Sequence, residues 1–380
     1  MNKHCSMIRS MLVRMTTAVA AAILIAPVAH AQVAVDFPLS VDNLPTYDRV
    51  NGLSIPFGPT ITVGDERLVV NPAVTYRSHL GKIDPSLSIV GQFTADSTVG
   101  FALTGSRGTF TNDGWIRSNL INSLVAFGLG RDSRNYFRGD RAEARLTSSL
   151  HLPVDVATVF VGARTERDWS TGWRSGSNMG PYSIFNNSDT TNGIERPNPA
   201  IDAGHITSAI AGGHLEYAGL PASLLVDVRL EAAGKTPLGG NFQQLTLDEG
   251  ASIKTVAGQH LDIRGHLVAT ATSSATPRQR YAYVGGSGSL ATVDLLSLGG
   301  DHLYLLDALY AIPINNVEIP ILGNPYIAPH FAMGAAAVGG FGRPAQNIGA
   351  RLGVSIFTLD YVINPRTHKS DFGAGISLAP

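Results

Sequence analysis

The sequence predicts an all-β fold, a single transmembrane antiparallel β-barrel of about 14–16 strands that follows a cleaved signal peptide. Three observations predict it. Many segments of about ten residues alternate apolar and polar side chains, the first 31 residues resemble an export signal, and 41 glycines and 21 prolines interrupt the chain throughout. Roughly ten residues is also the length that a tilted strand needs to cross a bilayer.

The alternation is clearest in residues 260–272 and 347–356. In the first segment Leu261 and Ile263 fall on one face, whereas Asp262 and Arg264 fall on the other. A helix would instead place residues three and four apart on one face. Bacterial barrels close on an even number of strands, so a further strand is expected within 108–137, or one segment is not a strand. The expected strands are residues 47–53, 68–76, 87–93, 98–104, 141–152, 156–164, 207–217, 224–232, 245–253, 261–271, 304–312, 326–337, 348–356, 358–363 and 372–378.

Charged side chains decide which face points inward. An arginine that faces lipid at mid-bilayer costs about 2–4 kcal/mol, whereas a water-filled lumen accommodates it. A soluble β-sandwich or propeller is the alternative fold, but the many consecutive strands with one nearly uncharged face and the absence of a propeller-length repeat favour the barrel. We expect an inner polar network, structural or lining a pathway, formed by Arg145, Asp227, Arg229, Glu231, His260, Asp262, Arg264, His266 and Arg351.

Residues 1–31 have the organisation of a secretory signal peptide. A basic start precedes an apolar, alanine-rich stretch, and Ala29-His30-Ala31 forms a small-x-small cleavage site. This pattern favours a cleaved signal over an N-terminal anchor helix. We expect an extended lead-in at residues 32–45 and a barrel at residues 46–380, located in the bacterial outer membrane. The single cysteine, Cys5, lies in the signal, which excludes disulfides and cysteine-based sites from the mature chain.

Charge and loop pattern limit the function further. With 28 basic and 29 acidic residues, no nucleic-acid partner is expected. Short turns at 153–155, 219–221 and 257–258 alternate with long loops at 169–203 and 273–301, as the periplasmic turns and outer loops of outer-membrane barrels do. Residues 115–130 suit a short helix or a folded loop better than a strand.

Several short motifs resemble the barrels of the bacterial surface antigen superfamily, which includes outer-membrane protein assembly factors and two-partner secretion transporters. Residues 47–53, Tyr-Asp-Arg-Val-Asn-Gly-Leu, resemble the opening motif of that family, and Phe372 to Ser377 resemble its closing strand. The resemblance implies a role in translocation of protein or solute, or in membrane insertion, with outer-membrane lipids and a periplasmic partner or client as partners. It also implies an inward-folding loop at Gly285, Gly286, Ser287, Gly288, Ser289 and Leu290.

Two departures from the family pattern bear on mechanism. Ala291-Thr292 stand where the family's loop carries an arginine-glycine pair, and no acid precedes Gly334, where the arginine's partner would lie. Either the arginine or its acidic partner alone would be a buried charge without a counter-charge, so the absence of both together is physically consistent. The chain also leaves no room for the family's periplasmic transport-associated domains.

An outer-membrane hydrolase of the lipase or deacylase type, with a lumen His/Asp/Ser site, is the alternative function. No nucleophile elbow, zinc-helix motif or phosphate loop is present. His260 and His266 share a polar face with Asp262 and Arg264, which suits either an acid–base cluster or, as we expect, a hydrogen-bonded lumen network. We therefore expect a protein that is not an enzyme, with no catalytic residue, cofactor or metal site.

Overall fold

The computed structural model describes residues 33–36, 44–64, 67–94, 97–151, 156–171, 182–185, 187–320 and 322–376. The predicted signal peptide at residues 1–31 and most of the predicted lead-in at 32–45 lie outside these residues. The described part of the lead-in contains a short strand, β1 (Val33–Asp36), which pairs antiparallel with β4 (Thr60–Val63).

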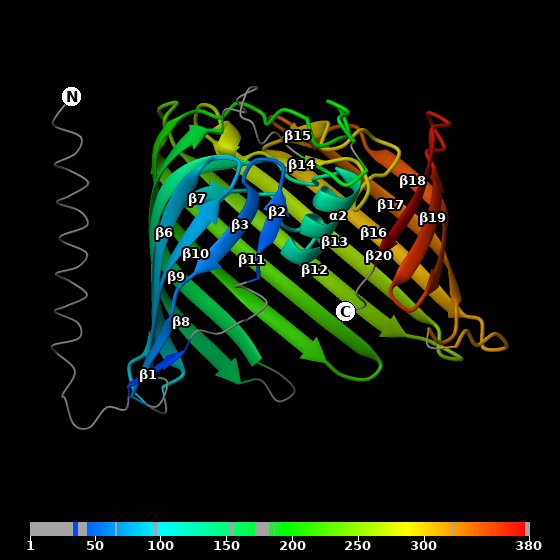
Figure 1. Ribbon diagram of the computed structural model, residues 1–380, viewed down its shortest axis with the longest axis horizontal. Helices are drawn as coiled ribbons and strands as arrows, with labels where there is room; N and C mark the ends of the chain where they lie inside the picture. The colour runs from blue at the N-terminus through cyan, green and yellow to red at the C-terminus, as the bar shows by residue number, and fades with distance from the viewer. Residues whose placement is uncertain are drawn as a thin grey trace.

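One large antiparallel sheet of 18 strands forms the body of the molecule (Figure 1). From β5 onward each strand pairs with the next, with β16 following β13. The intervening β14 (Ala282–Val284) and β15 (Leu298–Gly300) form a separate hairpin. Besides β1 and β4, the sheet contains β2 (Thr46–Asp48), β3 (Gly52–Phe57), β5 (Leu68–Arg77), β6 (Lys82–Gln92), β7 (Val99–Phe110), β8 (Phe137–His151), β9 (Val156–Ser170), β10 (Gly204–Ala218), β11 (Ala222–Lys235), β12 (Phe242–Lys254), β13 (His260–Thr272), β16 (His302–Pro313), β17 (Tyr326–Ala337), β18 (Ala345–Val354), β19 (Phe357–Ile363) and β20 (Ser370–Ile376).

The all-β prediction is confirmed, and each predicted segment from residue 68 onward overlaps one strand of the sheet. The strand number is higher than the predicted 14–16. The short strands β1 and β2 add to it, and β3 and β4 count as two strands although they pair end to end with the same strand, β5. No additional strand lies between β7 and β8. Residues 119–129 there form helix α2 (Asn119–Leu129), capped by the side chain of Ser118 and by Gly130 in the left-handed conformation.

The prediction that residues 47–53 open a single first strand, which ends at the turn of Pro56 and Pro59, is wrong. These residues form the β2–β3 hairpin, because the Asp48 carboxylate accepts hydrogen bonds from the backbone N–H groups of Val50 (2.9 Å) and Asn51 (2.7 Å). Gly52 then continues at φ 67°, a conformation that glycine adopts without strain. An aspartate three residues before Asn-Gly is a typical turn sequence, and its hydrogen bonds outweigh the strand preference of the apolar residues on either side.

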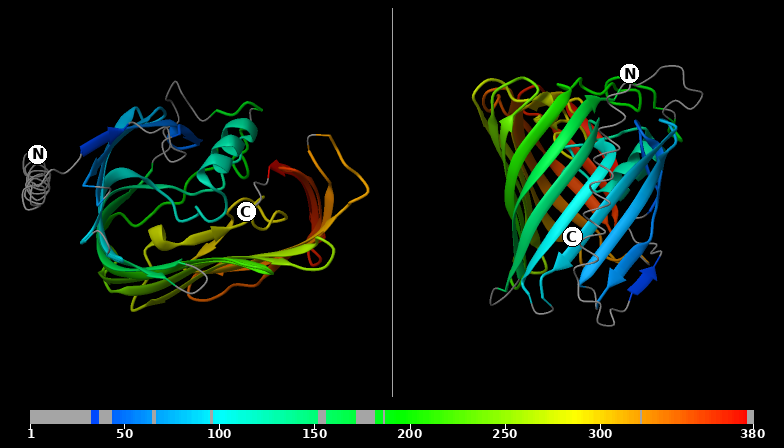
Figure 2. Two further views of the ribbon diagram at one scale, coloured as in Figure 1. Left: turned by 90° about the horizontal axis from the view of Figure 1, so that it is seen from below. Right: turned by 90° about the vertical axis from the view of Figure 1, so that its left-hand side faces the viewer.

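The long connections gather at one end of the sheet. The segments 111–136, 187–203 and 273–301 lie at the upper ends of the strands in Figure 1, whereas the turns at 219–221 and 255–259 lie at the lower end. Helix α2 and the β14–β15 hairpin lie near the end with the long loops (Figure 1), and in the view from below the hairpin lies inside the curve (Figure 2, left). The described connections therefore alternate as the sequence predicts, whereas the predicted turn at 153–155 and part of the predicted loop at 169–203 lie outside the described residues.

The curved sheet is open along one seam. β20 pairs with β19, and β2 pairs with β3, but no ladder joins β20 to β2 within the described residues. Figure 2, left, shows the two ends of the curve separated, with α2 in the opening. The seam leaves two edge strands, and an edge strand can pair through its backbone N–H and C=O groups. On β2, however, the backbone N–H of Tyr47 is already bound by Ser123 of α2.

The sheet is apolar outside and polar inside. Leu146, Val161 and Leu230 are 52%, 58% and 51% exposed, whereas Arg164 and Glu231 on the opposite face are 4% and 5% exposed. This is the reverse of a soluble sandwich, in which the apolar face is buried. The pattern fits a sheet whose outer face meets hydrocarbon.

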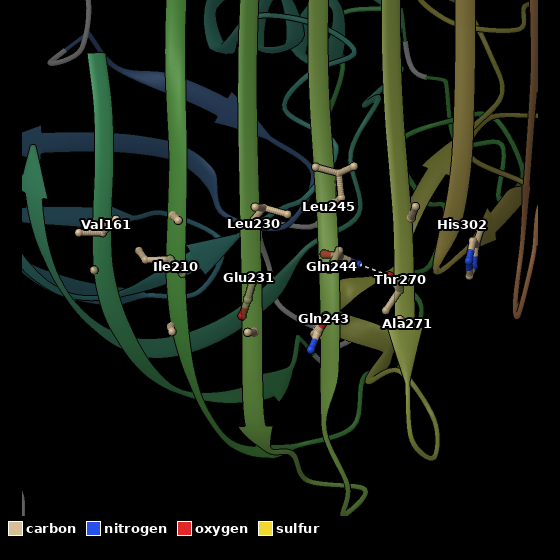
Figure 3. Close-up of a pocket in the computed structure, with 15 residues that line it drawn as sticks. Val161, Ile210, Leu230, Glu231, Gln243, Gln244, Leu245, Thr270, Ala271 and His302 are labelled. Atoms are coloured by element: carbon tan, nitrogen blue, oxygen red, sulfur yellow. Dashed lines mark hydrogen bonds between the residues drawn. The ribbon is translucent and has the colours of Figure 1, made fainter. Parts of the chain in front are cut away.

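Small residues on the outer face of β9 to β13 leave a hollow of about 850 Å³ (Figure 3). The strand register places Val161, Ala211, Leu230, Leu245 and Ala269 side by side on this face. Alanines between larger aliphatic side chains create the depression without adding any charge. The outer surface is therefore uneven here and mostly apolar, with Gln243 and His302 as polar side chains in the lining of the hollow.

We expect an arginine to be costly on this outer face and tolerated on the inner one. Leu230→Arg should reduce the free energy of unfolding by about 2–4 kcal/mol in lipid vesicles. Thr158→Arg is the matched control, since Thr158 is the register partner of the inner residue His214 and should change stability by less than about 1 kcal/mol. Urea titration in phosphatidylcholine vesicles measures both, and equal losses would contradict the assignment of inside and outside.

Candidate functional site: the lumen loop and its anchors

The connection between β13 and β16, residues 273–301, folds into the interior of the curved sheet. It contains a short 3-10 turn, η2 (Arg278–Arg280), and then the β14–β15 hairpin. Val284 and Leu290 are fully buried and pack against Val268 of β13 and Leu303 and Leu305 of β16. Figure 2, left, shows this segment in yellow inside the curve. We call residues 273–301 the lumen loop.

The tip of the lumen loop depends on glycine. Gly285, Gly286 and Gly288 adopt φ values of 131°, 83° and 100°, a region that other residues rarely occupy. The backbone N–H of Gly286 donates to the carbonyl oxygens of Leu290 (3.0 Å) and Val293 (2.8 Å), which closes the turn. A Cβ on Gly288 would lie 3.1 Å from the Arg117 side chain. The Gly-Gly-Ser-Gly sequence therefore allows both the tight turn and the close approach to Arg117.

An ion-pair network anchors the first half of the loop to the inner wall. Arg280 contacts Glu231 of β11 through two nitrogens, at 2.9 and 3.1 Å, and also pairs with Glu166 of β9. Arg164 adds a second cation to Glu231, and Arg141 lies 2.9 Å from Glu166. All except Arg141 are at most 5% exposed. Paired in this way, the charges offset the desolvation that each would suffer alone.

Hydrogen bonds anchor the tip of the loop to β18 and β13. Thr292 Oγ1 lies 2.5 Å from the amide of Asn347, a residue of β18 that is 1% exposed. In the orientation that satisfies both ends of this amide, its oxygen accepts from the Ala291 N–H at 2.8 Å. Arg264 of β13 donates to the Gly288 carbonyl oxygen at 2.7 Å. Thus Ala291-Thr292, where the resembling family has arginine, makes a neutral contact with the wall.

Arg117 supports the tip from the segment that precedes α2. It donates to Ser287 Oγ at 2.9 Å and to Ser133 Oγ at 3.1 Å. Burial lowers the pKa of Arg117 to about 10, helped by the nearby Arg131 and Arg264, so the guanidinium is still charged at neutral pH. The residues of the predicted inward-folding loop thus lie inside the sheet, with Ser287 bound by Arg117, Gly288 by Arg264, and Leu290 in the apolar cluster.

The other predicted inner residues form further ion pairs, mostly with partners that the sequence analysis did not single out. Some of these pairs are linked, because Arg164 lies 4.0 Å from Glu143 and His330 lies 4.0 Å from Asp360. Glu143 lies between Arg145 and Arg229, and Asp307 between Arg264 and His330. The remaining pairs are His214–Asp227 at 2.8 Å, His260–Asp262 at 3.3 Å, His266–Asp248 at 2.5 Å and Arg351–Asp360 at 2.7 Å.

His260 and His266 do not share an acid–base cluster. His260 pairs with Asp262, whereas His266 pairs with Asp248 and stacks on Trp115 with ring centroids 4.1 Å apart. The two histidines are six residues apart on one strand, a separation of roughly 20 Å at strand rise. Among the described residues no group of three or more His, Cys, Asp or Glu side chains is placed to hold a metal ion.

The β2–β3 turn inserts Arg49 into a polar cluster inside the seam. Arg49 is 2% exposed, and its guanidinium donates to the carbonyl oxygens of Arg196 (2.5 Å) and Arg134 (3.0 Å) and to Asn198 Oδ1 (2.5 Å). Its backbone N–H donates to Asp132 at 3.0 Å. The opening motif thus ties the first hairpin to the segment that follows α2 and to the connection between β9 and β10.

Asp113, in the connection before α2, is a buried carboxyl with an altered pKa. It accepts a hydrogen bond from the Asn135 backbone N–H at 2.7 Å and is 1% exposed. Burial raises its pKa to about 7, although the Asn135 hydrogen bond and the charges of Arg196 and Arg134 oppose the rise. The carboxyl is therefore substantially neutral in mildly acidic solution.

The sequence analysis missed Arg280, Arg164 and Glu166. Arg280 belongs to a loop of 29 residues with only four charges, Arg278, Arg280, Asp294 and Asp301, and this scarcity was the available signal. A charge retained in a loop that folds inward needs a counter-charge on the wall. Its partners lie 114 and 49 residues away in sequence, so only the fold brings them together.

Comparison with solved structures supports this description of the fold. The chain resembles the crystal structure of BamA from Haemophilus ducreyi lacking POTRA domains 1–3, with a TM-score of 0.53 and 11% identity over 91% of this chain and 73% of that one. It also matches CdiB from Acinetobacter baumannii (TM-score 0.43, 12% identity, 91% of this chain and 64% of that one) and CdiB from Escherichia coli (0.44, 9%, 90% and 66%). No family model and no curated protein matches the sequence.

The molecule therefore has the fold of an outer-membrane β-barrel of the BamA type. This likeness confirms the predicted all-β fold of barrel type. In the described residues, no helix is both long and apolar enough to cross a membrane.

We expect removal of the Arg280 charge to destabilise the lumen loop strongly. Arg280→Met leaves Glu166 and Glu231 buried with fewer counter-charges and should cost about 3–5 kcal/mol. Arg278→Met is the control, because its pair with Asp202 is 46% exposed on the arginine side and should contribute less than about 1 kcal/mol. Urea unfolding followed by gel mobility measures stability, and trypsin cleavage within 273–301 reports on release of the loop. Equal effects of the two variants would contradict the anchor.

We expect Asp113 to make stability decrease with pH. Its folded pKa, near 7, is above the ordinary value of 3.8, so between these values the unfolded chain has already lost the proton that the folded chain retains. The stabilisation is therefore complete below about pH 4 and is lost as pH rises toward 7. Melting temperatures at pH 5 and pH 8 test this: Asp113→Asn should reduce the difference between them. A difference unchanged by the substitution would contradict the prediction.

Proposed function

We propose that this protein acts in the bacterial outer membrane in the insertion or translocation of other proteins, and that its client pairs with the edge of β20 at the seam. The single observation that carries the proposal is the opening between β20 and β2 in a sheet that is otherwise continuous. An exposed strand edge offers main-chain hydrogen bonds to an added strand, which is the general mode of β-augmentation. Export through the signal at residues 1–31 and a periplasmic position of the short turns are part of the proposal.

The outer apolar face supports a membrane location. Phe372 on β20 is 67% exposed and Tyr361, its register partner on β19, is 53% exposed. Across the seam, Leu53 of β3 is 43% exposed. Apolar surface of this extent around the whole sheet is unfavourable in water and favourable against acyl chains.

The lumen loop supports a protein client over free passage of solute. It occupies the interior with a packed apolar cluster and is attached to β9, β11, β13 and β18. An interior packed in this way does not suit a freely permeable pore. The paired inner charges hold the loop in place and form the structural network of the lumen.

A hydrolase gains no support from the geometry. His260 and His266 belong to separate pairs, and Ser287 is held by Arg117, a cation that cannot accept its proton. The proposal is therefore of a non-enzymatic protein without cofactor, whose partners are outer-membrane lipids and a client polypeptide.

Site-specific photocrosslinking tests the proposed client site. A benzophenone amino acid at Phe372, next to the seam, should crosslink to a urea-unfolded outer-membrane β-barrel polypeptide added to vesicles that contain the protein. The same group at Leu230, which is also apolar and exposed (51%) but lies on the opposite wall, should not. Equal crosslinking at both positions, or none at Phe372, would overturn the proposal.

A further inference from the structure

Helix α2, like the strands of the sheet, exposes its apolar face and buries its polar face. A helix on the surface of a soluble protein does the reverse. Leu120, Leu124 and Phe127 lie one or two turns apart on one face and are 37%, 51% and 42% exposed. On the opposite face Asn122 and Ala126 are buried. A helix packed on an aqueous protein surface would bury the leucines and expose the asparagine.

Specific hydrogen bonds fix this orientation. The Asn122 side chain donates to Asp132 at 3.0 Å and accepts from the Ser133 N–H at 3.0 Å. Both partners belong to the inner polar cluster that also binds Arg49. The polar face of α2 is therefore held toward the lumen, so the apolar face necessarily points away from it.

The helix stands in the seam. On one side, the backbone N–H of Tyr47 in β2 donates to Ser123 at 3.1 Å, and the Tyr47 ring meets Phe127 edge-on at 5.3 Å. On the other side, Arg117 and Arg131, which flank α2, line a pocket of about 380 Å³ together with residues 369–371 at the start of β20. Figure 2, left, shows α2 between the two ends of the sheet.

The exposed face of α2 has no charge and is continuous with other apolar surface. The helix contains no Asp, Glu, Lys or Arg. Residues 182–185 pair with its end, because the N–H of Ile184 donates to the Phe127 carbonyl oxygen at 2.8 Å, and Ile184 and Phe185 are 55% and 72% exposed. Together with Leu53 and Phe372 on the seam strands, these side chains extend the outer apolar face across the opening.

We propose that α2 is a lipid-facing wall segment, and that Leu120, Leu124 and Phe127 contact the acyl chains of the outer membrane at the seam. The helix then separates hydrocarbon from the lumen where strand pairing is missing. The proposal rests on the membrane location in the proposed function. Lipid is the occupant that the observations favour, because the face is uncharged, shares its polarity with the strand exteriors and lies between them.

Quenching of a fluorophore by brominated phospholipid tests this assignment. With Cys5 replaced by serine, an NBD group is attached to single cysteines introduced as Leu124→Cys or Phe127→Cys, and the full-length protein is reconstituted into phosphatidylcholine vesicles. Leu230→Cys reports the lipid-facing wall and His214→Cys the aqueous lumen. Folding of each variant is checked by heat-modifiable gel mobility, and Leu120→Cys replaces either helix variant that fails to fold.

We expect NBD at positions 124 and 127 to be quenched by dibrominated acyl chains to the same extent as at 230, and to resist iodide. Quenching by iodide at both helix positions, with lipid quenching retained at 230, would overturn the assignment of α2 and leave the membrane location intact. Iodide quenching at 230 as well would overturn the proposed function and this inference together. Protection from both quenchers that increases with protein density would identify a second copy as the occupant and also overturn the inference.

Discussion

The paired charges on the inner face are the constraint on which the rest of the structure depends. A sheet that turns its apolar side outward must place its arginines and carboxylates inside, where partial burial makes each unpaired charge expensive. Arg280 with Glu166 and Glu231 satisfies this requirement between a loop and two strands. The same interactions that neutralise the wall therefore also determine where the lumen loop lies.

The seam follows from a second feature, the early turn at Arg49. Because Asp48 binds two backbone N–H groups of the turn, the chain reverses after three residues of β2 and cannot provide a full-length first strand to pair with β20. Arg49 then ties this hairpin to the segments around α2. The edge that remains is bordered by a helix with an inverted apolar face, so the opening is lined by a structured element.

Much of the sheet was predictable from period-two alternation, and the reason is physical. With water inside and hydrocarbon outside, almost every strand must keep one polar and one apolar face. Strands such as residues 261–271 and 348–356 can therefore be predicted from the sequence. The prediction failed at residues 47–53, where local hydrogen bonds of Asp48 outweigh the alternation. The charges of β11 and β13 were also placed on the inner face from the sequence, but their partners were not. Pairs such as Arg264–Asp307 depend on which strand lies next in the sheet.

The sequence by itself determined the fold class, the strand ranges beyond residue 68 and the polarity of each face, because these depend on neighbouring residues along one strand. The tertiary structure alone decided which wall charges hold the lumen loop, that Thr292 meets Asn347 in place of an ion pair, and that α2 turns its leucines outward. Those outcomes depend on contacts between residues far apart in the chain. Only the path of the backbone through space brings such residues within hydrogen-bonding distance.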